Sequence, residues 1–390
     1  MGYRWVVLAV GALAQGTNAA VFLGLPAITP QLREHFDLTL PQVGLLLGAV
    51  NLGTMLTLVP WGAAADRRGE RVVMTIGGAG AAVSLAMAAV DGPVVAGLAL
   101  VVAGLFGASV NAASGRAVMT WFPADRRGLA MGIRQTATPL GAALTAAVLP
   151  AVAVGAGVPA AFVALAAFTG FVAVAIAVLV REPPWASRAT DAKGGASLGV
   201  ILKDPALIRL SAAGALLVVP QFTAAALMVE LLHGHRGVAV GTAAALLAVS
   251  QVLGGLGRLG TGAWSDRTQD RITPLKTMSV AIAAGFALTA ALVDQAPTPV
   301  LAVALIATAA LALAWNGLAL TATAELAPEG RSGTALGMQN TANYLSATIT
   351  PPVASWLAAT TGWPTALLLA ALAAATARVL LTRTPTPTRT

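Results

Sequence analysis

Three arginines lie inside long apolar runs of this 390-residue chain, and their chemistry is the most specific that the sequence offers. They are Arg116, Arg134 and Arg258. An arginine at the centre of a membrane-spanning helix costs about 2.5 to 3.5 kcal/mol on insertion scales, so it is expected to face a cavity or a partner. None of the 15 acidic residues lies in the middle of an apolar run. A mobile anion would suit these cations, because a guanidinium can bind a carboxylate through two parallel hydrogen bonds.

Arg258 is predicted to be the main anion ligand. It precedes Asp266 by eight residues, which is about 12 Å along a helix. Gln251 lies seven residues earlier, on the same helix face. The alternative for Arg258 is a structural one, in which the guanidinium binds backbone carbonyls at the end of a helix.

Arg134 and Arg116 are predicted to be further ligands, at shallower positions. Arg134 follows Gly128 by six residues, or about 9 Å, and its alternative is to reach back to the membrane interface. Arg116 precedes Pro123 by seven residues, with Asp125 within plausible reach as an ordinary partner.

Neutral polar side chains within the apolar runs complete the predicted substrate site. Gln339 and Asn343 have the i, i+4 spacing of one helix face. For each of these residues a hydrogen bond between helices is the competing interpretation. The predicted set is Gln15, Asn18, Gln221, Gln251, Asn316, Gln339, Asn340, Asn343 and Tyr344.

The composition excludes a water-soluble protein of this size. Hydrophobic residues make up 57% of the chain and charged residues 10%, whereas about 25% charged is usual for soluble domains. The chain has no cysteine and three histidines, so thiolate chemistry, iron–sulfur centres and cysteine-bound zinc are excluded. No nucleotide-binding loop or nucleophile–base set is present, and we expect no metal, no cofactor and no enzymatic activity.

Twelve runs are long and apolar enough to cross the hydrocarbon core, which takes about 20 residues. The first run alone could be a signal peptide, but no small-residue cleavage site followed by a soluble domain appears. An all-α integral membrane protein is predicted. The spans are 5–27, 42–61, 72–91, 93–120, 128–151, 157–180, 206–231, 238–263, 275–294, 298–322, 333–355 and 362–382.

The basic residues predict the orientation of these spans. With the N-terminus inside, 18 of the 23 Lys and Arg residues fall on the cytoplasmic side, and only Arg33 and Arg236 fall outside. We therefore expect a protein of the inner, cytoplasmic membrane with both termini in the cytoplasm. The net charge of +8 then reflects topology and lipid headgroups, and no nucleic-acid partner is expected.

The chain is a duplicated unit of six spans. The motif at 62–67 recurs 200 residues later at 262–267, and that at 123–132 recurs 205 residues later at 328–337. At similar offsets Gln15 corresponds to Gln221 and Asn111 to Asn316. Parallel six-span repeats are a recognised transporter plan. The predicted organisation is an N-terminal half (1–181), a cytoplasmic linker (182–205), a C-terminal half (206–382) and a cytoplasmic tail (383–390).

The loop at 62–71 resembles the loop between spans 2 and 3 of the major facilitator superfamily, and the likeness covers nearly the whole chain. Glu70 replaces a basic residue of the family pattern, and the second copy has Gln269 where a glycine belongs. The resemblance implies the two-half major facilitator fold and a cytoplasmic gate latch. The implied gating residues are Gly62, Asp66, Arg67, Gly69, Arg71, Asp266 and Arg267.

Two further strings are similar to particular branches of that superfamily. The segment 257–267, which contains Arg258, is similar to span 8 of oxalate/formate exchangers and monocarboxylate carriers. The segment 121–132 resembles the loop between spans 4 and 5 of monocarboxylate carriers. In those families the span-8 arginine meets the substrate carboxylate, and the span-5 signature of drug/proton antiporters is not met here.

The predicted function is secondary active transport of a small organic anion, a mono- or dicarboxylate, by alternating access. Coupling would be to protons, with Glu230 as the candidate, or through anion exchange. The main alternative is a proton-coupled exporter of drugs or natural products. A membrane sensor or membrane-embedded enzyme is the competitor from another class. A monomer in the lipid bilayer is expected.

Overall fold

The computed structural model describes residues 2–90, 92–122, 124–181, 203–268, 270–327 and 332–384, and this part of the chain has helices and no strands. The chain forms two compact units, Met1–Ala192 and Lys193–Thr390. Most of the predicted linker, and the predicted tail from 385 onward, lie outside the described residues, so the predicted domain boundaries stay predictions. Each unit is described by itself below.

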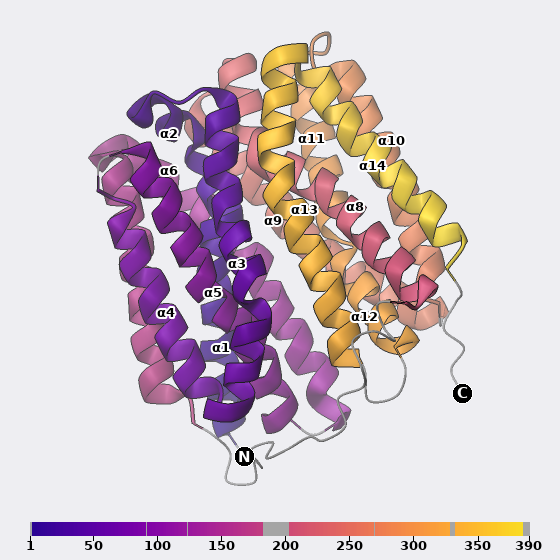
Figure 1. Cartoon of the computed structure of the whole chain (residues 1–390). Helices are drawn as coiled ribbons and strands as arrows, with labels where there is room; N and C mark the ends of the chain where they lie inside the picture. The colour runs from indigo at the N-terminus through magenta and orange to yellow at the C-terminus, as the bar shows by residue number, and fades with distance from the viewer. Residues whose placement is uncertain are drawn as a thin grey trace. The chain divides into compact units, whose positions relative to one another are not determined.

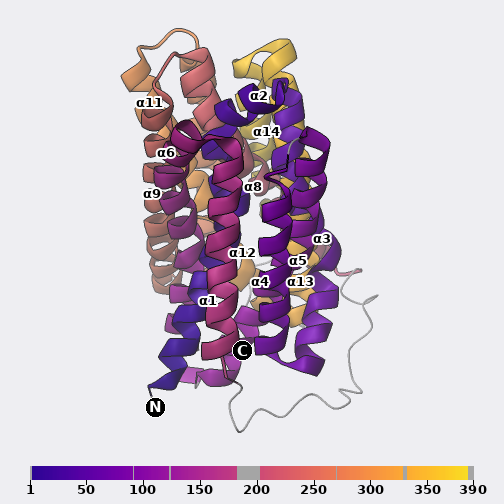
Figure 2. The same ribbon diagram turned by 90° about the vertical axis from the view of Figure 1, so that its left-hand side faces the viewer.

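The N-terminal half is a bundle of long helices, drawn from indigo to magenta in Figure 1. α1 packs on α6, and α4 packs on both α5 and α6, which Figure 2 shows from another side. Gly157 divides α6 into two helical segments, because its φ of +86° is not helical. The elements are α1 (Tyr3–Ala19), a π-helical turn (Ala20–Gly24), a 3₁₀ turn (Leu25–Ile28), α2 (Thr29–Phe36), α3 (Leu40–Arg68), α4 (Glu70–Met87), α5 (Pro93–Trp121) and α6 (Ala124–Leu179).

Local sequence explains where α3 begins, where it ends and how it packs. A capping box starts it, in which the Thr39 backbone N–H donates to Gln42 Oε1 at 2.8 Å. Gly69, with a φ of +83°, turns the chain into α4. Gly53 lets α3 approach α5 closely, since a Cβ there would collide with the Val101 carbonyl.

The C-terminal half repeats this arrangement with one interruption. α8 packs on α13 and α14, α10 packs on α14, and α9 packs on α11. The span predicted at 298–322 is broken at Ala314 and Trp315, so that it forms α11 and α12. The elements are α8 (Pro205–Glu230), a π-helical turn (Leu231–His235), α9 (Val240–Thr268), α10 (Ile272–Leu292), α11 (Thr298–Leu313), α12 (Asn316–Leu326), α13 (Ser332–Thr361) and α14 (Trp363–Thr382).

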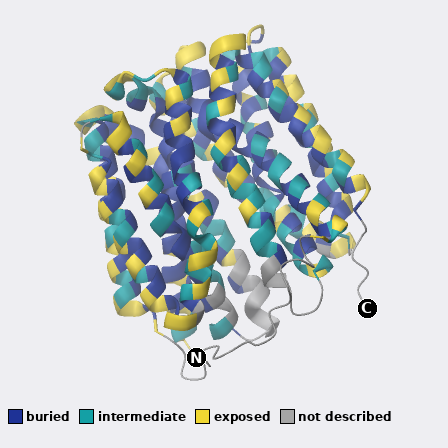
Figure 3. Cartoon of the chain, viewed as in Figure 1, coloured by how far each residue is buried: buried dark blue, intermediate teal, exposed yellow. Residues whose placement is uncertain are grey.

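Each of the twelve predicted spans contains a helix. Within the described residues, nine stretches are long and apolar enough to cross a membrane, and one of them, Ile133–Leu179, holds the two predicted spans on either side of Gly157. The spans predicted at 72–91 and 333–355 correspond to α4 and α13. Figure 3 shows exposed and buried positions alternating along the helices, as expected when one face packs on neighbours and another faces lipid.

Candidate functional site

Arg134 lies at the centre of a polar cluster formed by three helices of the N-terminal half. Its Nε donates to Ser114 Oγ at 2.8 Å, and one terminal nitrogen donates to Gln15 Oε1 at 3.4 Å and to the Asn111 carbonyl at 3.3 Å. The side chain is 8% exposed. Arg134 therefore points into the bundle, and the alternative in which it reaches the membrane interface does not describe its position.

The same cluster joins α1 to α5 through side-chain amides. Gln15 Nε2 donates to Asn111 Oδ1 at 2.7 Å and approaches Thr138 Oγ1 at 3.5 Å. Gln15 is twelve residues past the start of α1, and Arg134 is ten past the start of α6, which is about 15 to 18 Å along each helix. The cluster therefore lies several turns from the start of each helix.

A small cavity borders the Arg134 side chain. It has about 210 Å³ of space that atoms do not fill, and its walls include Val7, Gly11, Ala117 and Phe122. Ser114, which accepts the Arg134 hydrogen bond, is part of the same wall. The guanidinium therefore borders a narrow space that is lined mainly by apolar side chains.

The C-terminal half keeps the amide pair but not the arginine. Asn316 Nδ2 donates to Gln221 Oε1 at 2.9 Å, so the repeat mates of Asn111 and Gln15 are also bonded to each other, with donor and acceptor exchanged. With the 205-residue offset, Gln339 occupies the position of Arg134. The amide pair is thus a duplicated structural bond, and its surroundings have diverged.

Gln339 and Asn343 share one face of α13, as the sequence predicted. A Cβ placed on Gly214 of α8 would lie 3.1 Å from Gln339 Nε2 and 3.0 Å from Asn343 Oδ1. Gln339 is fully buried, and among the described residues neither of its amide atoms has a hydrogen-bond partner; the same holds for Asn343 Oδ1. Buried amides without partners cost about 1 to 3 kcal/mol each, so these atoms are suited to accept a ligand's polar groups.

Arg258 contacts a backbone carbonyl of a neighbouring helix. Its Nε donates to the Leu313 carbonyl at 2.9 Å, at the C-terminal end of α11. This contact is the one expected from the structural alternative stated above, and a role as an anion ligand stays a prediction. Arg134 and Arg258 belong to different halves, and each is described within its own half.

Two buried amides at corresponding positions of the repeat have no protein partner. Gln251 is 1% exposed, and Asn51, which precedes it by 200 residues, is 1% exposed as well. Among the described residues, neither amide nitrogen nor oxygen of either side chain is hydrogen-bonded. Gln251 was predicted, whereas Asn51 was missed, although the repeat offset could have identified it.

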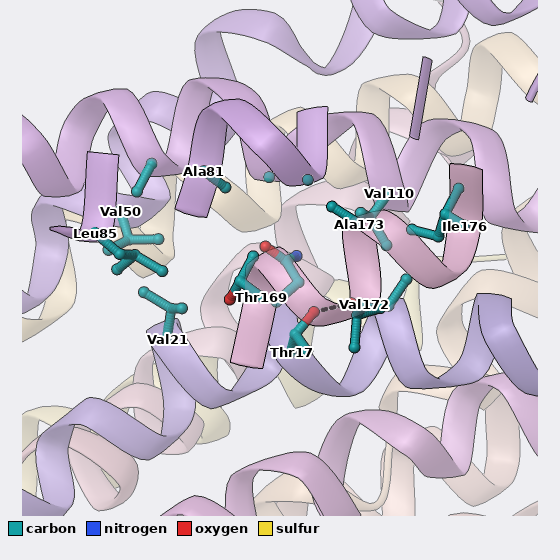
Figure 4. A pocket seen from close by; sticks show the side chains of 15 residues that line it. Thr17, Val21, Val50, Ala81, Leu85, Val110, Thr169, Val172, Ala173 and Ile176 are labelled. Carbon is teal, nitrogen blue, oxygen red and sulfur yellow. Dashed lines mark hydrogen bonds between the residues drawn. The ribbon is translucent and has the colours of Figure 1, made fainter. Parts of the chain in front are cut away.

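Asn18 lines a separate cavity inside the N-terminal half, which Figure 4 shows from close by. This cavity has about 420 Å³ that atoms do not fill. Its walls are mostly apolar, with the hydroxyls of Thr17 and Thr169 as the other polar groups. The Thr17 hydroxyl donates to the Ala14 carbonyl at 2.8 Å. Asn18 therefore lines a mostly apolar cavity and is not among the described hydrogen-bond partners of Arg134.

Glu230 is the last residue of α8 and is 3% exposed. Its carboxylate packs over the following π-helical turn, where a Cβ on Gly234 would lie 2.8 Å from Oε1. Its role in proton coupling stays a prediction.

The predicted gate loops are described only in part. The Asp66 and Asp266 side chains lie outside what the structure describes, so their pairing stays a prediction. Arg67, Arg71 and Arg267 are exposed.

The second loop makes a contact that sequence reasoning missed. Arg271 pairs with Glu325 of α12, with Nη2 and Oε1 3.2 Å apart. Gly62 and Gly262 do not lie at close helix contacts, since a Cβ on either residue would meet no atom within 4 Å. In the first loop, Gly69 serves the turn instead, through its positive φ.

The remaining predicted residues are not joined to the Arg134 cluster by any described contact. The Arg116 side chain lies outside the described part of the chain. Asn340 and Tyr344 on α13 are half-buried. Their roles stay predictions.

Comparison with known proteins decides the family. The family model described as "Major Facilitator Superfamily" matches residues 8–351 and, in a second match, residues 270–390. The chain belongs to the major facilitator superfamily. The predicted family, the all-helical fold and a multi-pass membrane transporter are thereby confirmed.

Relatives and solved structures agree with this assignment. The uncharacterized MFS-type transporter Rv2994 of Mycobacterium tuberculosis (strain ATCC 25618 / H37Rv) is 37% identical over 373 residues, which cover 95% of this transporter and 82% of that protein. The uncharacterized MFS-type transporter MT3072 of Mycobacterium tuberculosis (strain CDC 1551 / Oshkosh) has the same identity and coverage. Neither name carries a substrate, so the likeness to monocarboxylate and oxalate/formate carriers stays a prediction.

Two solved structures share the fold of this transporter. A bacterial homologue of the human lysosomal transporter Spinster, inward-facing and occupied, superposes with a TM-score of 0.79 at 17% identity and covers 99% of this chain and 98% of its own. A D-xylose–proton symporter superposes with a TM-score of 0.78 at 16% identity and covers 98% of this chain and 97% of its own. At these identities the likeness concerns the fold alone.

Proposed function

We propose that this transporter moves a small organic anion, a mono- or dicarboxylate, by alternating access, and that Arg134 binds the carboxylate. The observation that carries the proposal is the position of Arg134. Its guanidinium is 8% exposed and borders a small cavity. An arginine buried within a membrane protein is a candidate functional group, because burying its charge is costly.

The named contacts of Arg134 hold the guanidinium in a fixed orientation. A hydroxyl, a side-chain amide oxygen and a backbone carbonyl accept its hydrogen bonds. Fixing the planar fork in this way reduces the entropy lost when a carboxylate binds to it. The site is therefore suited to recognise a planar anion.

We propose that the buried amides of the C-terminal half form a polar site of that half. Gln339, Asn343 and Gln251 carry amide atoms without described partners. These atoms include donors and acceptors, so they suit a cargo that bears hydroxyl, carbonyl or second acid groups. Asn340 and Tyr344 belong to the same helix and are proposed as weaker contributors.

Proton coupling is proposed to run through Glu230. The carboxylate is 3% exposed and lies at the end of α8. Its protonation would remove a buried charge, and the free energy of that change can bias the conformation of α8.

We propose a cytoplasmic location for both termini and for the gate loops, following the distribution of basic residues.

One observation favours the second candidate, an exporter of drugs or natural products. The cavity at Asn18 is mainly apolar, as expected for a site that binds lipophilic compounds. That candidate predicts cationic or neutral cargo and transport that does not need Arg134.

Reconstitution into liposomes tests the proposal. Uptake of labelled lactate, oxalate, succinate and phosphate is compared with that of the cationic dye ethidium, with and without a pH gradient. We expect uptake of at least one carboxylate by the wild type, its loss in Arg134→Gln and partial retention in Arg134→Lys. Transport of ethidium alone, unchanged in Arg134→Gln, would favour the exporter.

A further inference from the structure

Span 10 of the C-terminal half is interrupted by a turn at Ala314 and Trp315, both of which keep right-handed helical φ and ψ. We call this turn the break; the counterpart helix in the N-terminal half is continuous. α11 ends at Leu313 and α12 begins at Asn316. With the 205-residue offset, this break corresponds to residues 108–111, which lie inside the unbroken helix α5. The two halves therefore differ in the backbone of one equivalent helix.

The carbonyls at the break are capped by two side chains of α9. Arg258 Nε donates to the Leu313 carbonyl at 2.9 Å, and Thr261 Oγ1 donates to the Ala314 carbonyl at 2.9 Å. The last carbonyls of a helix lack intrahelical partners. In a membrane each unsatisfied backbone group costs several kcal/mol, so such caps decide whether a broken helix is tolerated.

The corresponding positions of the N-terminal half carry different residues. Leu58 stands where Arg258 stands, and Trp61 stands where Thr261 stands. There Thr57 Oγ1 and Trp61 Nε1 both donate to the carbonyl of Leu105, at 2.6 and 2.7 Å. Arginine thus occurs beside the broken helix, and leucine occurs beside the continuous one.

The C-terminal end of α12 is held by contacts with Arg271, which also contacts α9. Glu325 pairs with Arg271 at 3.2 Å, and Arg271 Nη1 also donates to Ser265 Oγ of α9 at 2.8 Å. At the near end, Asn316 bonds Gln221 of α8. α12 is therefore an eleven-residue helix with a described side-chain contact at each end.

We propose that Arg258 is a positioning residue: together with Thr261 it caps the break in span 10 and sets the angle of α12, which carries the Glu325 ion pair. This role differs from the anion ligand that the sequence predicts for Arg258. It goes beyond the proposed function and holds whether or not Arg134 binds the cargo. The device acts through the Nε hydrogen bond and does not require the positive charge.

Two substitutions separate the hydrogen bond from the charge. In Arg258→Gln the amide nitrogen is as many bonds from the backbone as Nε is, so the donor is kept while the charge is removed. Arg258→Leu removes both and installs the residue type of the N-terminal half. Because the leucine is apolar, its insertion into the membrane is favourable, and Leu259→Ala provides a matched control at an exposed position of α9.

Spin labels on either side of the break report the angle directly. The chain contains no cysteine, so single cysteines at Val300 of α11 and Thr321 of α12 can be labelled in an otherwise unchanged protein. They are 21 residues apart, or about 32 Å along a helix, which suits pulsed electron paramagnetic resonance. We expect one narrow distance distribution for the wild type, Arg258→Gln and Leu259→Ala, and a shifted or broadened one for Arg258→Leu. An unchanged distribution in Arg258→Leu overturns the proposal.

Transport kinetics give a second readout that a ligand role would move differently. With labelled lactate, oxalate and succinate as probes, Arg258→Leu is expected to lower the maximal rate about tenfold and to leave the half-saturation concentration within about twofold. Arg258→Gln should keep at least a third of the wild-type rate. A tenfold or greater rise in the half-saturation concentration for Arg258→Gln, with the spin-label distances unchanged, assigns Arg258 to the cargo and refutes the positioning role. If the wild type transports none of these probes, the anion proposal fails and the spin-label distances alone decide the role of Arg258.

Discussion

The two halves of this transporter share one amide pair, and among the described contacts an arginine joins that pair only in the N-terminal half. Gln15 and Asn111 are bonded in the N-terminal half, as Gln221 and Asn316 are in the C-terminal half. In the first half Arg134 joins the pair, whereas in the second half Gln339 takes its position. The amide bond is therefore common to both repeats, whereas the residue at the position of Arg134 and Gln339 differs between them.

The cations also differ in what they contact. Arg134 is oriented by side chains and borders a cavity, while Arg258 caps a backbone carbonyl at a break in its neighbouring helix. We propose that the arginine of one half binds the cargo and that the arginine of the other half supports the helix backbone. The contacts of the guanidinium distinguish the two uses, and its depth does not.

The largest effect is expected for removal of the Arg134 charge. Hydrogen bonds to charged groups contribute about 1.5 to 3 kcal/mol, so Arg134→Gln should lower carboxylate uptake about tenfold to a hundredfold. Arg134→Lys should lose less, because it keeps the charge and loses only the bidentate geometry. Initial rates in proteoliposomes measure both, and equal losses in the two variants would argue that charge is not what the cargo recognises.

The next effect compares the repeated amide pairs. Gln15→Leu and Gln221→Leu each leave a half-buried asparagine without its amide partner, and each should reduce stability by about 1 kcal/mol. Only Gln15 also contacts Arg134, so only Gln15→Leu should reduce carboxylate transport beyond the loss of folded protein. Thermal unfolding and uptake per folded molecule separate the two effects, and equal transport losses would refute a divided role.

A smaller effect of opposite sign is expected at Gln339. Leucine there removes two buried amide atoms that have no described partner, so stability should rise by about 1 kcal/mol. For a half of roughly 200 residues this raises the unfolding temperature by about 2 to 4 °C. Transport of the carboxylate should fall at the same time, and a stable variant with full transport would remove Gln339 from the proposed site.

The smallest expected effect is on the stability that Asp270 contributes at the start of α10, compared with the start of α4. Partial burial raises the pKa of Asp270, but hydrogen bonds from Thr273 and Ile272 and the charge of Lys276 outweigh it, so the pKa lies below its usual value. A carboxyl with a lowered folded-state pKa stabilises the protein above its unfolded pKa, about 3.9, and loses this contribution as pH falls through the folded pKa.

Asp270→Ala should therefore cost about 0.5 kcal/mol at pH 7, at the low end of the range for helix caps. The difference from the wild type should shrink below about pH 4. Glu70 occupies the corresponding place in the N-terminal half and is buried. Unfolding of Asp270→Ala and Glu70→Ala across pH compares the starts of the two helices. A pH-independent difference between Asp270→Ala and the wild type would contradict the capping role of Asp270.

The fold could be predicted from the sequence because the membrane imposes a strong pattern. About 20 apolar residues are needed for each crossing, and the repeated motifs at 62–67 and 262–267 identify the two halves. The break at Ala314 could not be predicted, since no proline lies in span 10 between Pro299 and Pro328. The break depends on caps from Arg258 and Thr261, which lie more than 50 residues away along the chain.

The site could be predicted only in part, because spacing along one helix does not give contacts between helices. The shared face of Gln339 and Asn343 followed from their i, i+4 spacing. The hydrogen bond from Arg134 to Ser114 depends on how α6 packs near α5, which no local pattern encodes. Arg258 was given a ligand role from its depth, whereas its observed contact depends on a helix break in a neighbouring span.

Equilibrium binding of the cargo to the purified transporter tests the central claim most directly. The labelled carboxylate with the highest uptake is titrated against wild type, Arg134→Gln and Arg258→Gln in lipid nanodiscs. We expect saturable binding by the wild type and Arg258→Gln, and at least tenfold weaker binding by Arg134→Gln. Wild-type affinity in Arg134→Gln would contradict the account, because the carboxylate would then be held elsewhere.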